Sequence, residues 1–122
     1  MIDFKNKAIF KLRKTSATPH GIDALLIDGE GIIGSYNALR DYVVFTTKRI
    51  ISVNAQGMTG KKIDYTSMPY SKVQVFSVET AGVFDMDSEL DLVFSGLGKV
   101  RFEFAGTSDI VAIGKIIGQY VL

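Results

Sequence analysis

The sequence predicts a mainly β domain: a partly open barrel of two packed antiparallel sheets, about seven strands in all, capped by a C-terminal α-helix. Three observations predict this fold. Short β-branched and aromatic segments recur between turn residues over residues 32–79. Residues 84–104 alternate apolar and charged side chains, as in strands with one wet face. Residues 107–122 instead show helical periodicity.

Composition indicates one folded domain. A chain of 122 residues can bury a core without disulfides or structural metal ions. Its composition, with 47% hydrophobic and 22% charged residues, is typical of globular proteins. Because the chain has no cysteine, disulfides, thiolate nucleophiles, zinc–cysteine sites and iron–sulfur clusters are excluded. The first residues lack the apolar run of a secretory signal, and no apolar stretch is long enough to span a bilayer. We therefore expect a cytoplasmic protein.

The N-terminal segment is basic. Residues 1–14 carry a net charge of +4, whereas the rest of the chain carries −3. Ile2, Ile9 and Leu12 have the spacing of a short amphipathic helix over residues 2–13, and residues 15–21 contain a proline and suit a linker. The sequence thus divides into a basic segment and linker, 1–20, and a domain, 21–122. The basic charges can meet anionic lipid or nucleic acid, but a solvated face is the favoured interpretation.

The first part of the domain alternates turns with strands. An apolar run over residues 22–27 can close a first helix onto the domain, and the DGEG sequence at 28–31 predicts a turn. β-branched and aromatic residues then predict strands over 32–39, 42–47, 49–54, 61–65 and 71–79. Residues 56–60 form a glycine-bracketed hairpin loop. Pro69 cannot donate to a ladder, so it marks a loop or a strand start.

The last two strands have the clearest pattern. Over residues 84–94 one face is predicted to hold Phe84, Met86, Leu90, Leu92 and Phe94, and the other Asp85, Asp87, Glu89 and Asp91. Residues 96–98 are expected to form a turn. After it, Val100, Phe102 and Phe104 alternate with Lys99, Arg101 and Glu103. Lys99 and Arg101 can therefore lie across from the acids of the preceding strand.

The chain ends in an amphipathic helix. Thr107 or Ser108 can cap it, and Asp109 suits the positive end of its dipole. The apolar face comprises Ile110, Ile113, Ile116, Ile117, Tyr120 and Val121. Such a helix can cover the open corner of a two-sheet barrel. Seven strands followed by a capping helix is the order of the pleckstrin-homology (PH) architecture.

Three phrases resemble one family. RDYVVFTTKRII (40–51), QGMTGKKIDYTSMPY (56–70) and FSVETAGVFDMDSEL (76–90) closely resemble the bacterial PH domain family, formerly a domain family of unknown function, and LLIDGEGIIGSYNALRD (25–41) is similar to its entry into the first strand. The resemblance covers roughly residues 22–122. It implies a PH-like domain with no catalytic activity and no cofactor. It also implies a closed ring, of five subunits, that acts as an adaptor for protein partners through a hydrophilic surface where neighbouring subunits meet.

The resemblance implies candidate residues for contacts at the surface or between subunits. It does not show on which side of the domain each residue lies. The candidates for this polar interaction surface are Arg40, Asp41, Lys48, Arg49, Lys61, Lys62, Glu79, Asp85, Asp87 and Glu89. The polar residues Thr46, Gln56 and Thr80 lie in the same phrases.

Other functions have weaker support in the sequence. The acidic run 85–91 lacks the glycine and glutamate of a calcium-binding EF-hand, since Leu90 and Gly96 stand there. The single histidine, His20, has no partners for a metal site or a catalytic triad. No carboxylate pair falls in an apolar setting suited to acid–base catalysis, and the paired glycines lack a phosphate-loop pattern.

One alternative function stays open. The basic segment together with Lys48, Arg49, Lys61 and Lys62 would form an anion site on a peripheral membrane protein if these residues converged. Exposed charges that deter edge pairing are the favoured interpretation. Nucleic-acid binding is disfavoured because the net charge is only +1 and basic residues do not alternate with exposed aromatics.

Overall fold

A computed structural model describes residues 1–2, 4, 8–19, 21–39, 41–56, 58, 60–84, 86–105 and 110–122. The described elements are β1 (Ala8–Thr15), the 3₁₀ helix η1 (Ile22–Leu25), β2 (Ile32–Ala38), β3 (Asp41–Thr46), β4 (Arg49–Gln56), β5 (Lys62–Pro69), the 3₁₀ helix η2 (Tyr70–Lys72), β6 (Val73–Glu79), β7 (Ser88–Phe94), β8 (Gly98–Phe104) and α1 (Ile110–Val121).

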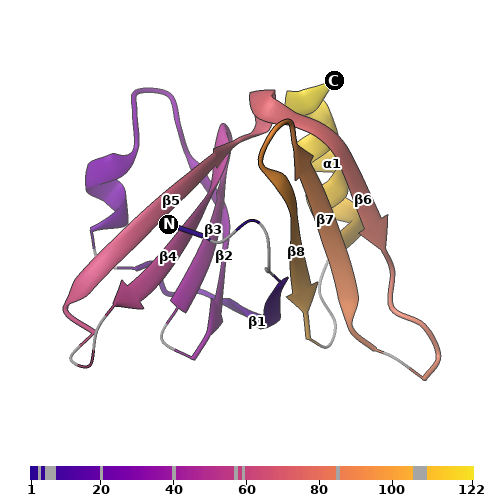
Figure 1. Ribbon diagram of the computed structural model, residues 1–122, viewed down its shortest axis with the longest axis horizontal. Coiled ribbons are helices and arrows are strands. Elements are labelled where there is room, and N and C mark those ends of the chain that lie inside the picture. The colour runs from indigo at the N-terminus through magenta and orange to yellow at the C-terminus, as the bar shows by residue number, and fades with distance from the viewer. Residues whose placement is uncertain are drawn as a thin grey trace.

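The strands form one mixed sheet whose two halves splay apart (Figure 1). Its order is β5-β4-β3-β2-β1-β8-β7-β6. All neighbours are antiparallel except β1 and β8, which run parallel. The expected mainly β fold with a C-terminal helix is therefore confirmed. The described strands number eight rather than seven, and β1 joins what the sequence suggested were two separate sheets.

Strand β1 is the element that the sequence pattern concealed. A helix was expected over residues 2–13, and this is wrong because residues 8–15 are extended. The start of β1 pairs with β8, and its end, from Arg13, pairs with β2. The register shifts between Ile9 and Leu12, where Lys11 has a φ of 58°. Such a bulge interrupts the two-residue alternation by which a strand is recognised.

The main core lies between the two halves of the sheet and α1. Phe102 and Phe104 of β8, Phe45 of β3 and Ile117 of α1 are buried together there. A smaller cluster lies on the other face of β3 and β4, where Ile22 of η1 covers Val44 and Ile51. From the apolar run at 22–27, Ile22 and Leu26 pack on the sheet, and the expected helix is a single 3₁₀ turn, η1; Leu25 and Ile27 are exposed.

Helix α1 packs against β6, β7 and η2 (Figure 1). It begins at Ile110, and the expected caps Thr107 and Ser108, with Asp109, lie outside the described residues. Tyr120 near its end stacks on Tyr70 with ring centroids 5.7 Å apart. Tyr70 is buried and its hydroxyl donates to the backbone oxygen of Thr46 at 2.8 Å. The helix end is thereby joined to the β3–β4 turn.

The segment before β7 differs from the expected strand over 84–94. Leu90, Leu92 and Phe94 are buried as expected. Phe84 and Met86, which were expected on the same face, are instead exposed because β7 begins only at Ser88. The alternation of apolar and charged residues in the sequence extends back to Phe84, whereas strand β7 begins only at Ser88.

Two glycines of α1 provide a matched test of helix packing. A Cβ at Gly114 would lie 2.7 Å from Cγ2 of Val78 in β6, whereas at Gly118 it would meet Cζ of Phe76 at an ordinary 3.8 Å. Because the valine side chain is stiff, we expect Gly114→Ala to lower the free energy of unfolding by about 1–3 kcal/mol. Gly118→Ala should be neutral or stabilising by up to about 1 kcal/mol. Urea unfolding measures both; equal effects would contradict this packing.

Candidate functional site

Two strands of the described sheet are paired on one side only. These are β5 and β6, the outermost strands. Along β5 the exposed residues include Lys62, Ile63 and Ser67, and along β6 they include Val75 and Ser77. A free edge presents backbone donors and acceptors that a further strand can pair with. We treat the outer sides of β5 and β6 as the candidate interaction surface.

Exposed charges of opposite sign stand at the start of β5 and at the end of β6. Lys62 begins β5, with Lys61 just before it, and both are exposed. Lys62 makes no ion pair with any described residue. The exposed Glu79 ends β6 and is followed by the exposed Thr80. One edge therefore starts with a positive charge and the other finishes with a negative one.

Glu79 is the first of three glutamates that stand opposite one another on neighbouring strands. The register places Glu79 of β6 opposite Glu89 of β7, and Glu89 opposite Glu103 of β8. Like charges directly opposite on neighbouring strands destabilise a sheet. Burial raises the pKa of Glu89; Arg101 opposes this rise, and Glu79 and Glu103 add to it. This glutamate row, Glu79–Glu89–Glu103, favours the approach of positive charge.

Arg101 only partly balances the row. It binds both carboxylate oxygens of Asp91, at 2.8 and 2.9 Å, and reaches Glu89 at 3.3 Å. These cross-strand contacts confirm the expectation for Arg101 but not for Lys99, which lies opposite Val93. Glu103 was not among the expected site residues. Its charge pattern was visible in the sequence, but its position opposite Glu89 depends on the strand register.

Arg49, an expected surface residue, is held inside the fold. Its guanidinium donates from Nε to Glu30 Oε2 at 2.9 Å and from Nη2 to Glu30 Oε1 at 3.0 Å. It also donates to Ser67 Oγ and to the backbone oxygen of Leu25. The Glu30 side chain is 0% exposed and that of Arg49 is 19% exposed. Arg49 is therefore occupied in joining the 28–31 turn to β4 and β5.

Hydrogen bonds control the ionisation of Glu30. Burial alone would raise its pKa, but bonds from Arg49, from the Thr46 hydroxyl and from the Ile27 amide outweigh burial and lower the pKa to about 2. Thr46 is itself fully buried. Glu30 thus remains charged as a buried partner of Arg49, and this polar network supports the fold rather than an exposed surface.

Two of the basic residues proposed for an anion site, Lys48 and Lys62, lie far apart. Lys48 lies in the turn before β4, whereas Lys62 pairs with Gln56 at the far end of that strand. Because β4 has eight residues, its ends are roughly 20 Å apart. With Arg49 occupied by Glu30 as well, Lys48, Arg49 and Lys62 form no common anion site in the described part of the chain.

Of the remaining expected residues, some make contacts within the fold and others lie outside the described residues. Asp41 accepts a hydrogen bond from the Ala55 amide at 3.1 Å, and Asp87 pairs with Lys11 at 2.9 Å. Arg40, Asp85 and His20 lie outside the described residues. Asp41 and Asp87 therefore act within the fold in the described part of the chain.

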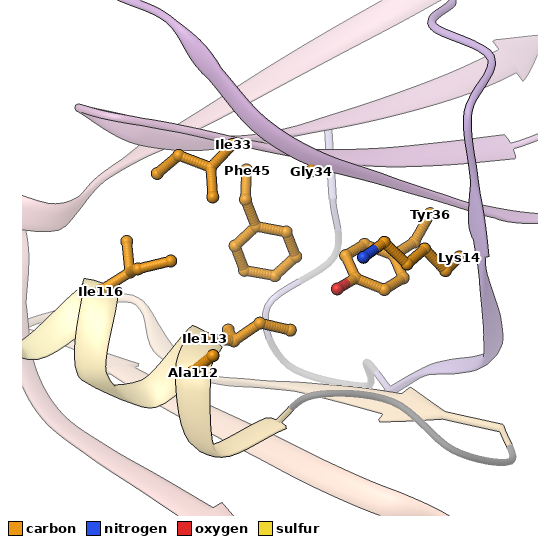
Figure 2. Close-up of a pocket in the computed structure, with 8 residues that line it drawn as sticks. All are labelled: Lys14, Ile33, Gly34, Tyr36, Phe45, Ala112, Ile113 and Ile116. Carbon is orange, nitrogen blue, oxygen red and sulfur yellow. The ribbon is translucent and has the colours of Figure 1, made fainter.

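A separate cleft lies between α1 and β2 (Figure 2). We call it the α1–β2 cleft; its volume is about 100 Å³ and it is lined by Lys14, Ile33, Gly34, Tyr36, Phe45, Ala112, Ile113 and Ile116. Figure 2 shows Lys14 beside Tyr36, with Phe45 facing the helix residues. No sequence pattern predicted this cleft. Its one local signal is a glycine, Gly34, inside a strand.

Neither a metal site nor a spanning helix is found in the described part of the chain. No group of three or more histidine, aspartate or glutamate side chains is placed there to hold a metal ion. No helix among those residues has the length and apolar character needed to cross a bilayer.

Comparison with known proteins gives consistent matches. The sequence profile described as Bacterial PH domain matches residues 3–121. The uncharacterized protein YjqA of Bacillus subtilis is 42% identical over 105 residues, which cover 84% of each chain. The crystal structure of a DUF1696 family protein with a pleckstrin-homology domain from Shewanella loihica is 39% identical, with a TM-score of 0.72, covering 92% of this chain and 98% of that one. A pleckstrin homology domain from Shewanella amazonensis is 44% identical, with a TM-score of 0.61 and 82% of each chain covered.

The Glu30–Arg49 pair predicts a pH dependence of stability. The pKa of Glu30 is about 2 in the folded chain against an ordinary 4.5, so the unfolded chain takes up the proton at higher pH. The stabilisation, about 3 kcal/mol, is thus complete above pH 4.5 and is lost as the pH falls toward 2. We expect Glu30→Gln to lower stability by about 3 kcal/mol at pH 7 and to remove this part of the acid dependence.

Urea unfolding between pH 7 and pH 2.5 measures this difference. Asp28→Asn, which removes an exposed acid of the same turn, is the control and should leave both stability and its pH dependence nearly unchanged. The same acid dependence in Glu30→Gln and in the unaltered chain would contradict the assignment.

Proposed function

Because this chain belongs to the bacterial PH domain family, we propose that it is a non-enzymatic domain that assembles into a closed ring and serves as an adaptor for another protein. The observation that carries this proposal is the pair of free edges, β5 and β6, with opposite charges at their ends. The profile match names no catalytic family. The strongly lowered pKa of Glu30 belongs to a buried ion pair rather than to an open pocket, which also supports a non-enzymatic role.

Two different edges on one chain suit a cyclic assembly. When β5 of one copy pairs with β6 of the next, each copy uses both edges and the contact repeats head to tail. Such heterologous contacts produce a ring when the rotation closes. Closure leaves no free edge, which prevents open-ended association. A ring of five subunits is our expectation from the family resemblance stated above.

The charges favour one strand direction in the proposed contact. Lys62 stands at the start of β5 and Glu79 at the end of β6. Antiparallel pairing brings these two residues together, whereas parallel pairing would bring Lys62 to Val73, at the start of β6. We therefore propose an antiparallel β5–β6 contact between copies. It would also cover Val75, an apolar residue that is 58% exposed on the edge.

The glutamate row is the part of this surface proposed to meet a partner. It begins at Glu79 and crosses β7 to β8, so it would extend away from each contact between copies. In a ring it would be repeated once per subunit, so several weak contacts would act together. A partner segment rich in lysine or arginine would relieve the repulsion among the three carboxylates. The membrane alternative has weaker support, since Lys48 and Lys62, two of its basic residues, lie at opposite ends of β4.

Charge reversal tests the proposed contact. Lys62→Glu would place like charges at each contact between copies, and so would Glu79→Lys; like-charge contacts at an interface cost several kcal/mol. We expect each single variant to shift the assembly toward monomers. The double variant restores an opposite pair and should recover assembly. Light scattering coupled to size-exclusion chromatography at micromolar concentration measures the mass of each.

Arg13→Glu is the matched control, because this exposed arginine lies on β1, in the interior of the sheet and not on either edge strand. Its assembly should equal that of the unaltered chain. A strictly monomeric unaltered chain would contradict the ring. Single variants that assemble normally would contradict the β5–β6 contact.

A further inference from the structure

The α1–β2 cleft is a second site, in a different part of the molecule from the edges. Its walls come from β1, β2, β3 and α1, none of which is an edge strand. The cleft is therefore independent of the proposed assembly, and its lining decides which small ligand it fits.

The cleft exists because α1 leans toward one half of the sheet. The helix packs on β6, β7 and η2, and Gly114 allows close approach to Val78 of β6. On its other side, α1 faces β2 across the cleft (Figure 2). There Gly34 provides no side chain, although a Cβ would meet only the Tyr36 ring at an ordinary 3.7 Å. The space is therefore open because glycine has no side chain, and not because the backbone is strained there.

The floor of the cleft is apolar and its rim carries one positive charge. Tyr36, Phe45 and Ile113 are buried and form the floor, and Ile116 is half-buried. Lys14 is exposed and lies directly across from Tyr36 in the β1–β2 register. It makes no ion pair with any described residue, and no carboxylate is among the lining residues. This combination suits a ligand with an apolar body and a negative end.

The volume sets the size of that ligand. A volume of about 100 Å³ holds roughly three or four groups the size of a water molecule or a methylene. A carboxylate at the rim adds to this length. We propose that the α1–β2 cleft binds an aliphatic carboxylate of about four to six carbons, with its chain on Tyr36, Phe45 and Ile113 and its carboxylate on the Lys14 ammonium.

Two structural features distinguish this ligand from others of similar size. An amine would bring its positive charge to Lys14, and an alcohol would lose the charge-assisted bond. The first turn of α1, where Ala112 and Ile113 line the cleft, also has the positive end of the helix dipole nearby. The carboxylate should therefore bind more tightly than its alcohol and its amine.

Titration of 4-methylpentanoate into ¹⁵N-labelled protein, followed by amide chemical shifts, tests the proposal. We expect saturable shifts in β2 and in the first turns of α1, with a Kd on the order of 1–10 mM for so small a ligand. 4-Methylpentan-1-ol and 4-methylpentylamine should bind more weakly. Lys14→Gln should raise the Kd about three- to tenfold.

Two further variants separate the site from general effects. Gly34→Val fills the cleft with a residue that strands favour, and it should abolish the saturable shifts while its spectrum remains folded. Lys115→Gln removes an exposed lysine of the same helix that does not line the cleft, and it should leave the Kd unchanged. Absence of saturable shifts, shifts outside the cleft, or equal binding by Lys14→Gln would overturn the proposal.

Discussion

Backbone pairing through β1 is the constraint on which the rest of the structure depends. This strand pairs with β8 at its start and with β2 at its end, so it joins two antiparallel groups into one sheet. The splay of those groups creates the space that the buried phenylalanines and α1 fill. Because β1 lies in the middle, the free edges fall to β5 and β6. The proposed surface therefore follows from how the N-terminal strand is inserted.

Charge is distributed in two ways in this domain. Inside, Glu30 and Arg49 are paired and hydrogen-bonded, which makes their burial tolerable and holds the 28–31 turn against β4. Outside, Glu79, Glu89 and Glu103 stand opposite one another with Arg101 as a partial counter-charge. The first arrangement stabilises the chain by itself. The second leaves unfavourable repulsion that a positively charged neighbour would reduce, and this contrast is why we propose the glutamate row as a contact surface.

Local pattern predicted the elements whose backbone follows a regular period. The alternation over Leu90, Leu92 and Phe94 and the spacing of Ile110, Ile113 and Ile117 were correct in element and in buried face. The bulge at Lys11 broke that period, so β1 resembled a helix. Phe84 and Met86 continue the alternation on the N-terminal side of β7, before strand pairing begins at Ser88. Their burial was therefore predicted wrongly. Arg49 looked like a surface residue because its partner lies nineteen positions away.

The sequence by itself determined the class of fold, the family and the lack of cysteine chemistry, because these depend on composition, on local period and on recognisable phrases. Only the tertiary structure decided which charges meet. The row of three glutamates depends on strand register, and the separation of Lys48 from Lys62 depends on the direction and length of β4. The cleft beside Gly34 depends on which half of the sheet α1 packs against. Such distances join residues remote in the chain, so no local pattern contains them.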